Sequence, residues 1–136
     1  MEIRSLVDPK VILGVILDKH EFPPGIAFWT DVKEPIQVVT FRYGFGKVLL
    51  PHRHIERKRE VLKTQEVLFV LSGSCNLDIY DLDDKLVFFQ KLISGRGYIS
   101  FYGGVGYKVL SDDTKMIEVK VGPYEVESDE EDRIRI

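Results

Sequence analysis

Two histidines stand one residue apart in the stretch GKVLLPHRH, at positions His52 and His54. The apolar residues before them, including Val48 and Leu50, predict a β-strand over 47–54. Alternate side chains of a strand share a face, so both imidazoles would lie above Val48 and Leu50. Imidazole binds transition metals and also moves protons near neutral pH. The pair is therefore a candidate metal claw, a candidate acid–base pair, or two polar residues at a strand end.

A carboxylate that could join the histidines is Glu66, the first residue of the apolar stretch EVLFVLSG. If this stretch and the preceding one form a hairpin, the two imidazoles converge on Glu66 across the strand pair. Two histidines and a glutamate occur together in catalytic zinc sites. Leu68 and Val70 share the face of Glu66, which gives an apolar floor under a polar mouth, the usual shape of a small-molecule site.

The elements that must position these residues read as short strands rich in Val, Ile, Phe and Tyr, separated by turn residues. No segment has a convincing helical stripe. Many short strands predict an all-β domain of antiparallel strands, a sandwich or barrel. The predicted strands are 10–18, 26–30, 36–43, 47–54, 66–73, 75–81, 85–92, 97–102, 106–110 and 116–121.

Two strands carry predictions about their faces. The stretch MIEVKV alternates cleanly, and an interior face holding Glu118 and Lys120 would be costly, so the aliphatic residues Ile117, Val119 and Val121 are expected to face the core. The stretch 66–73 is apolar on its second face as well. A sheet with two apolar faces must be covered on both, by another element or another subunit, and we expect a homodimer.

Length and composition bound the rest. The 136 residues, 44% hydrophobic and 30% charged, fit one soluble domain, with an acidic, solubilising tail over about 125–136. The net charge of −3 shows no basic face, so no nucleic-acid partner is expected. No apolar run suits a membrane span and the N-terminus lacks a secretory signal, so we expect no membrane association and a cytoplasmic protein. The single cysteine, Cys75, is expected to be buried.

The spacing around the histidines resembles the first motif of the cupin superfamily, and the resemblance covers about residues 36–122, which would form the core of a single cupin-like domain. Gly46 precedes His52 by five intervening residues, and Glu66 precedes Gly73 by six. The chain departs from the family in placing eleven residues between His54 and Glu66, a longer spacer than usual, which an elongated hairpin would absorb. The resemblance implies a double-stranded β-helix, the jelly-roll barrel, and a small polar ligand. It also implies a divalent metal (zinc, manganese, iron or nickel), with His52, His54 and Glu66 as ligands.

The family's second motif normally adds one more histidine, which this chain lacks. Counting from Gly97, the histidine position is Lys108; aligned on the GGVG turn, as in a group of small cupins, it is Val105. Lysine would repel a divalent cation and suit an anionic ligand, whereas valine would leave the corner open. The remaining histidine, His20, is expected in a surface turn.

Three functions stay open. One is a metal-binding cupin acting on or sensing a small polar metabolite. Another is a metal-free sugar-nucleotide isomerase or epimerase, because QEVLFVLSGSC is similar to a strand of the dTDP-sugar ketoisomerases, which are cupins without a metal. In that case the histidine pair would act as acid and base, with His54 as the catalytic residue. The last is a ligand-binding module without activity. Candidate substrate-binding residues are Arg42, Arg59, Tyr102, Tyr107 and Lys108.

Overall fold

The computed structural model describes residues 1–123 and 134–136, and within them the protein is all-β with antiparallel sheets. The only helix among these residues is a short 3-10 turn, η1 (Lys19–Glu21), and none is long and apolar enough to cross a membrane. The strands are β1 (Glu2–Arg4), β2 (Ile12–Asp18), β3 (Gly25–Phe28), β4 (Val39–Arg42), β5 (Glu66–Ser72), β6 (Ser74–Tyr80), β7 (Leu86–Ile93), β8 (Arg96–Ser100), β9 (Gly104–Val109) and β10 (Lys115–Lys120).

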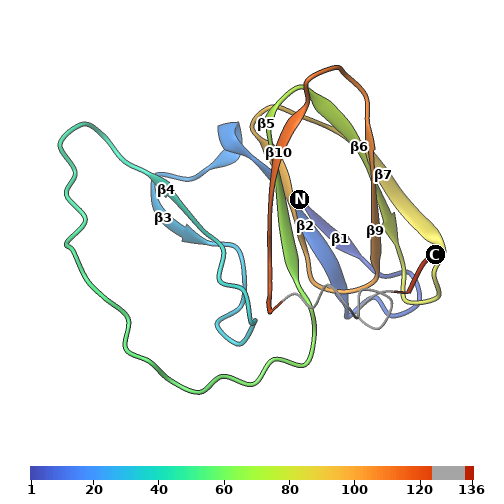
Figure 1. Cartoon of the computed structure of the whole chain (residues 1–136), viewed down its shortest axis with the longest axis horizontal. Coiled ribbons are helices and arrows are strands. Elements are labelled where there is room, and N and C mark those ends of the chain that lie inside the picture. Colours follow the sequence, from blue (N-terminus) through green and yellow to red (C-terminus); the bar gives the residue numbers. More distant parts are fainter. Residues whose placement is uncertain (124–133) are drawn as a thin grey trace.

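The strands form three separate sheets rather than one closed barrel. A five-stranded sheet has the order β1-β2-β8-β5-β10, a three-stranded sheet has the order β7-β6-β9, and β3 pairs only with β4. The two larger sheets pack face to face on one side of Figure 1, while β3 and β4 lie apart from them. The predicted sandwich-like architecture is therefore present at the level of two packed antiparallel sheets.

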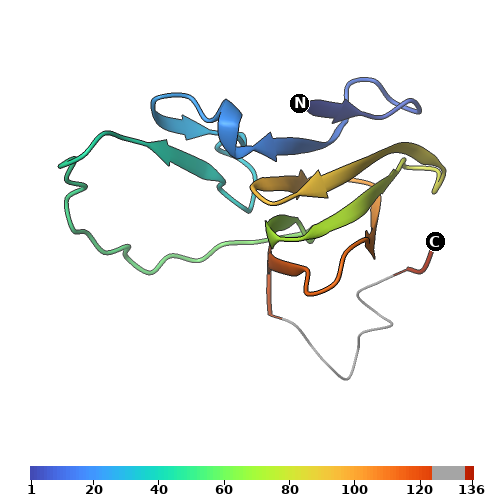
Figure 2. The same cartoon turned by 90° about the horizontal axis from the view of Figure 1, so that it is seen from above.

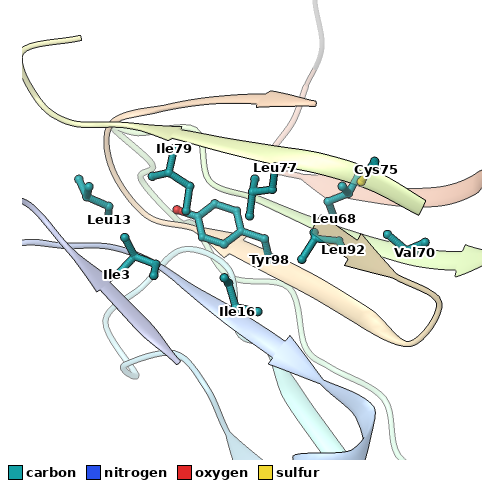
Figure 3. Packing of buried hydrophobic residues seen from close by; sticks show 10 residues of the cluster. All are labelled: Ile3, Leu13, Ile16, Leu68, Val70, Cys75, Leu77, Ile79, Leu92 and Tyr98. Atoms are coloured by element: carbon teal, nitrogen blue, oxygen red, sulfur yellow. The ribbon is translucent and has the colours of Figure 1, made fainter. Parts of the chain in front are cut away.

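The space between the two larger sheets is filled by one apolar cluster (Figure 3). Leu68 and Val70 enter it from β5, and Leu77 and Ile79 enter it from β6, all at most 4% exposed. Cys75 is fully buried in the same cluster, which confirms its predicted position. Burial of each such aliphatic side chain is worth about 1.5–3 kcal/mol, so this cluster is the main source of stability of the sandwich.

A second apolar cluster lies on the outer face of the five-stranded sheet. Val15, Leu17 and Ile99 are buried there, and Trp29 and Val38 of the segment around β3 and β4 pack against them. The chain thus covers part of the outer sheet face itself, which weakens the reason for expecting a second subunit on that face. The cover is incomplete, because Leu71 on β5 and Ile117 and Val119 on β10 stay about half exposed.

The inward face of β10 is opposite to the prediction. Met116, Glu118 and Lys120 pair with Val70, Leu68 and Glu66 of β5, and residues paired in this way share a face. Met116 packs against the inter-sheet cluster, whereas Ile117 and Val119 point away from it. The prediction failed because β10 is an edge strand: its polar residues end at an open margin of the sandwich, where water can reach them.

Nine of the ten predicted strands are present, with ends shifted by a few residues. β1 has no counterpart among the predicted strands, because three residues carry too little periodicity. The predicted strand 47–54 is wrong: those residues have no regular secondary structure. They belong to residues 43–63, here called the arm, which bows away from the sheets in Figures 1 and 2. The predicted acidic tail falls mostly on residues 124–133, outside the described residues.

Gly73 forms the tight turn between β5 and β6 and has a backbone reason to be glycine. Its φ is +76°, and a Cβ built there would lie 2.4 Å from Oγ1 and 2.8 Å from Cα of Thr114. Any other residue would meet both left-handed strain and a backbone clash. The turn places the start of β6 beside β5 and so joins the two sheets.

Candidate functional site

A cavity of about 500 Å³ opens between the two larger sheets, at the side where β9 and β10 end them. This volume falls within the range typical of small-molecule sites. Gly103 from the turn before β9 and Gly104 and Gly106 of β9 itself supply bare backbone to one wall. The polar side chains gather on β5, β9 and β10. The lining comprises Thr64, Glu66, Tyr80, Ser100, Gly103, Gly104, Val105, Gly106, Tyr107, Glu118, Lys120 and the C-terminal residues 134–136.

Glu66 is the centre of the polar wall. The hydroxyl of Tyr107 on β9 donates to Oε1 of Glu66 at 3.3 Å, which bridges the two sheets across the cavity. Lys120 on β10 stands directly opposite Glu66 in the strand register, and Glu118 precedes it on the same face. Three charged side chains and a phenol therefore meet at one end of an otherwise apolar interior.

The phenol of Tyr107 is held in its protonated form. Burial raises the pKa of Tyr107 far above its ordinary value, and the neighbouring carboxylate of Glu66 raises it further, because a phenolate there would be desolvated and repelled. Tyr107 is therefore a hydrogen-bond donor at every physiological pH and cannot act as a base near neutrality.

Tyr98 lies deeper on β8, two residues before the cavity-lining Ser100. It is fully buried, and its hydroxyl has no hydrogen-bond partner among the residues that the structure describes. Burial raises the pKa of Tyr98 strongly, with the Glu66 carboxylate adding to the effect. In Figure 3 the ring spans the inter-sheet cluster, with its oxygen toward Leu13 and Ile79. Tyr98 is thus part of the apolar floor rather than of the polar wall.

The structure separates the two candidates for the missing histidine position. Val105 pairs with the buried Ile79, packs against the inter-sheet cluster and lines the cavity. Lys108 pairs with Asn76, is exposed and does not line the cavity. The inward position on this turn is therefore aliphatic, and the ammonium that does reach the cavity belongs to Lys120.

The histidine pair does not join Glu66 in this conformation. His52 and His54 sit on the exposed arm, with their rings edge to face at 5.2 Å between centroids. Nδ1 of His52 lies 3.2 Å from the carbonyl oxygen of Leu50. Within residues 1–123 and 134–136, no three His, Cys, Asp or Glu side chains lie close enough together to hold a metal ion.

The remaining predicted residues are dispersed. The Arg42 guanidinium donates to the Phe22 carbonyl at the end of β4, and Arg59 lines a shallow hollow within the arm. Tyr102 carries the ammonium of Lys63 over its ring, 3.9 Å from the centroid. Of the proposed substrate-binding set only Tyr107 lines the inter-sheet cavity. His20 lies in the exposed turn η1, as expected.

Sequence reasoning missed Glu118 and Lys120 as site residues. The available signal was the pairing of 116–121 with 66–73, which places both beside Glu66, but the rule against charges in a core pointed the other way. A scan against protein-family models, a search of curated proteins and a search of solved structures each found no match for this chain.

Proposed function

We propose that this protein is a small cupin-type β-sandwich that binds a small polar metabolite in the cavity between its two sheets. The observation that carries the proposal is the convergence of Glu66, Tyr107, Glu118 and Lys120 at the mouth of an apolar interior. The cupin likeness is supported by the spacing of Gly46, the histidines, Glu66 and Gly73 and by the packing of two antiparallel sheets, which is compatible with a jelly roll.

The polar side chains at the cavity mouth determine which chemical groups a ligand must carry. The carboxylates of Glu66 and Glu118 accept hydrogen bonds from hydroxyl or ammonium groups. The Lys120 ammonium donates to carbonyl, carboxylate or hydroxyl oxygens, and the Tyr107 hydroxyl, whose proton goes to Glu66, accepts from a ligand donor. A compound with both kinds of group, such as a sugar or a short hydroxy or keto acid, would satisfy the wall, and Val105 would pack against its carbon skeleton.

A divalent metal does not fit the arrangement of the described residues. Glu66 faces Tyr107 and Lys120, and the histidines expected to complete the set lie outside the cavity on the arm. An ammonium directly opposite the carboxylate disfavours a cation there. The proposed function is therefore ligand binding by the chain's own side chains, with no step assigned to a metal. His54 lies outside the cavity, so this conformation gives no support to acid–base catalysis by that residue.

Thermal unfolding with a panel of compounds tests the proposal. We would measure melting temperatures with D-glucose, UDP-glucose, 2-oxoglutarate, acetate, Zn²⁺, Mn²⁺ and Ni²⁺, for wild type, Glu66→Gln and the matched control Glu21→Gln. Glu21 is exposed in η1, remote from the cavity in sequence and topology. An organic ligand at a hundred times its Kd stabilises the folded state by about 2.7 kcal/mol. Stabilisation of wild type and control, lost in Glu66→Gln, supports the proposal. No stabilisation by any organic compound, or stabilisation by a metal alone, contradicts it.

A further inference from the structure

Several large apolar side chains of the arm are exposed to solvent. Phe45, Val48, Leu50 and Leu62 are each at least 70% exposed, and Ile55 is 67% exposed. Contiguous exposed apolar patches on soluble proteins usually mark an interaction site. The arm therefore needs a cover that its own sandwich does not provide in this conformation.

Both ends of the arm are bonded to the segment around β3 and β4, which covers part of the outer face of the five-stranded sheet. At its start, Arg42 donates to the Phe22 carbonyl at 3.0 Å. At its end, Lys63 forms an ion pair with Glu34 at 2.8 Å, and the buried Gln65 next to it holds the same carboxylate. Between these points the arm projects away from the sandwich, in both Figure 1 and Figure 2. The fastened ends hold it away from its own inter-sheet cavity.

Within residues 1–123 and 134–136, two strand edges beside that cavity have no neighbouring strand. β10 ends the five-stranded sheet, β9 ends the three-stranded sheet, and both line the cavity (Figure 1). An unpaired edge presents free backbone donors and acceptors, which readily pair with another extended segment. These two edges are therefore the natural docking positions for a strand.

The edge of β9 suits the arm better than the edge of β10. β10 has a lysine at each end, Lys115 and Lys120, whereas β9 has one, Lys108, and lysines on an edge discourage pairing and repel a basic segment. β9 carries two glycines, Gly104 and Gly106, whose backbone also borders the cavity. A Cβ at Gly106 would come no closer than 3.7 Å to another side chain, whereas one at Gly104 would clash with Ile136, so the room for an added strand begins at Gly106.

The arm has the sequence of an edge strand. Its residues 47–54 alternate as a strand does, and Pro51 is the one residue there without a backbone N–H. When this segment is extended, the N–H and C=O groups of its even-numbered residues point to the side opposite those of Pro51. These residues are Val48, Leu50, His52 and His54. An added strand needs only one bonded side, so Pro51 can face solvent while the four even-numbered residues pair.

Charge favours docking of the arm on the body of another molecule. Residues 43–63 hold six Lys or Arg and two Glu, a net charge of +4, whereas the whole chain carries −3. The rest of the chain therefore carries −7. Arm and body attract, whereas two bodies without arms would repel.

We infer that the arm of a second copy of this chain adds residues 47–54 as a strand to the open edge of β9, reciprocally, so that each cavity is completed by a histidine pair from the other subunit. A reciprocal exchange is isologous and closes as a twofold dimer. The exchange would cover Val48 and Leu50 of the arm and bring His52 and His54 of the partner subunit to the cavity rim. The inference stands on open edges, exposure and charge, and it does not depend on the ligand proposed above.

Cross-linking of isotope-mixed protein tests the exchange. Equal amounts of ¹⁴N and ¹⁵N full-length protein are unfolded, mixed, refolded and treated with an amine-reactive cross-linker, and peptides joining Lys47 or Lys58 of the arm to Lys108 of β9 are sought by mass spectrometry. We expect a dimer in sedimentation, with about half of these peptides of mixed isotope, because copies pair at random. A monomer, like-isotope peptides only, or a dimer without arm-to-β9 peptides overturns the inference.

A variant pair separates arm docking from general surface effects. Leu50→Asp on the arm should yield a monomer with an unchanged far-ultraviolet spectrum and no mixed-isotope peptides, because Leu50 is 80% exposed in the free arm. Leu6→Asp is the control, since Leu6 is 77% exposed on a loop outside the arm, and it should remain a dimer. A Leu50→Asp protein that dimerises like the control also overturns the inference.

Discussion

The close approach of β2 and β8 makes Gly14 a sensitive position, and Gly14→Ala is the sharpest structural test of how the cavity floor is built. Gly14 pairs with Ser100, next to the strand position from which Tyr98 enters the core. A Cβ built on Gly14 would lie 2.2 Å from the Tyr98 hydroxyl oxygen and 2.3 Å from the carbonyl oxygen of Ile99. The first atom belongs to a buried ring and the second to the backbone of the sheet, so neither can yield cheaply.

Two effects of opposite sign determine how Gly14→Ala changes the free energy of unfolding. Replacing glycine by alanine lowers the entropy of the unfolded chain, which stabilises the folded state by about 0.4–1 kcal/mol where the site accepts a methyl group. Overpacking a close-packed interior costs about 1–3 kcal/mol or more. Because all three of the nearest contacts at Gly14 fall below 2.5 Å, the upper part of that range applies. The net expectation is a loss of about 1–2 kcal/mol or more.

Urea unfolding followed by circular dichroism measures this difference, and Gly44→Ala is the matched control. A Cβ on Gly44 meets nothing within 4 Å and the residue has no positive φ, so the control should be neutral or slightly stabilised. The midpoint of Gly14→Ala should fall with an unchanged slope, which is the signature of lost stability in the same transition. If Gly14→Ala is as stable as Gly44→Ala, the close packing of β2 on Tyr98 is wrong.

Three further predictions concern the core and its buried polar groups. Leu77→Ala, at a fully buried position, should cost about 2–5 kcal/mol in chemical unfolding, while Leu82→Ala on an exposed turn should cost far less; equal losses would contradict the assigned core. Tyr98→Phe removes a buried hydroxyl without a partner among the described residues, so unfolding should show a change of no more than about 1 kcal/mol or a gain, and a large loss would reveal a missed hydrogen bond. Burial raises the pKa of Asp81, but the hydrogen bonds that its carboxylate accepts outweigh this and lower the pKa below 3.8. The stability that Asp81 contributes is therefore complete above that value and lost as pH falls through the lower folded value, so Asp81→Asn should flatten the acid limb of stability against pH; an unchanged limb would contradict this linkage.

The strand β5 was predictable because apolar residues occupy both of its faces. The stretch that became β5 holds Leu68 and Val70 against the inter-sheet core and Val67 against the outer cluster, and its pattern was strong enough to place Glu66 correctly at its start. The turn at Gly73 was also predictable, because only glycine adopts its backbone conformation without strain.

The arm and the inward face of β10 could not be read in the same way. The stretch 47–54 has the alternation of a strand, but a strand also needs a neighbour, and the pattern does not say which edge supplies it. On β10, the charges of Glu118 and Lys120 argued for solvent, although solvent enters the sandwich itself at its open side. Local periodicity predicts where strands lie and which residues share a face. Which strand pairs with an edge strand depends instead on contacts between segments that are distant in the sequence.

The most direct test of the proposed function is a two-dimensional ¹H–¹⁵N NMR titration of the full-length protein with D-glucose and with 2-oxoglutarate. The proposal predicts saturable shifts for at least one compound, centred on the amides of Gly104, Gly106 and Tyr107, and their disappearance in Glu66→Gln. Shifts confined to the arm, shifts that never saturate, or shifts that persist in Glu66→Gln would contradict binding in the inter-sheet cavity.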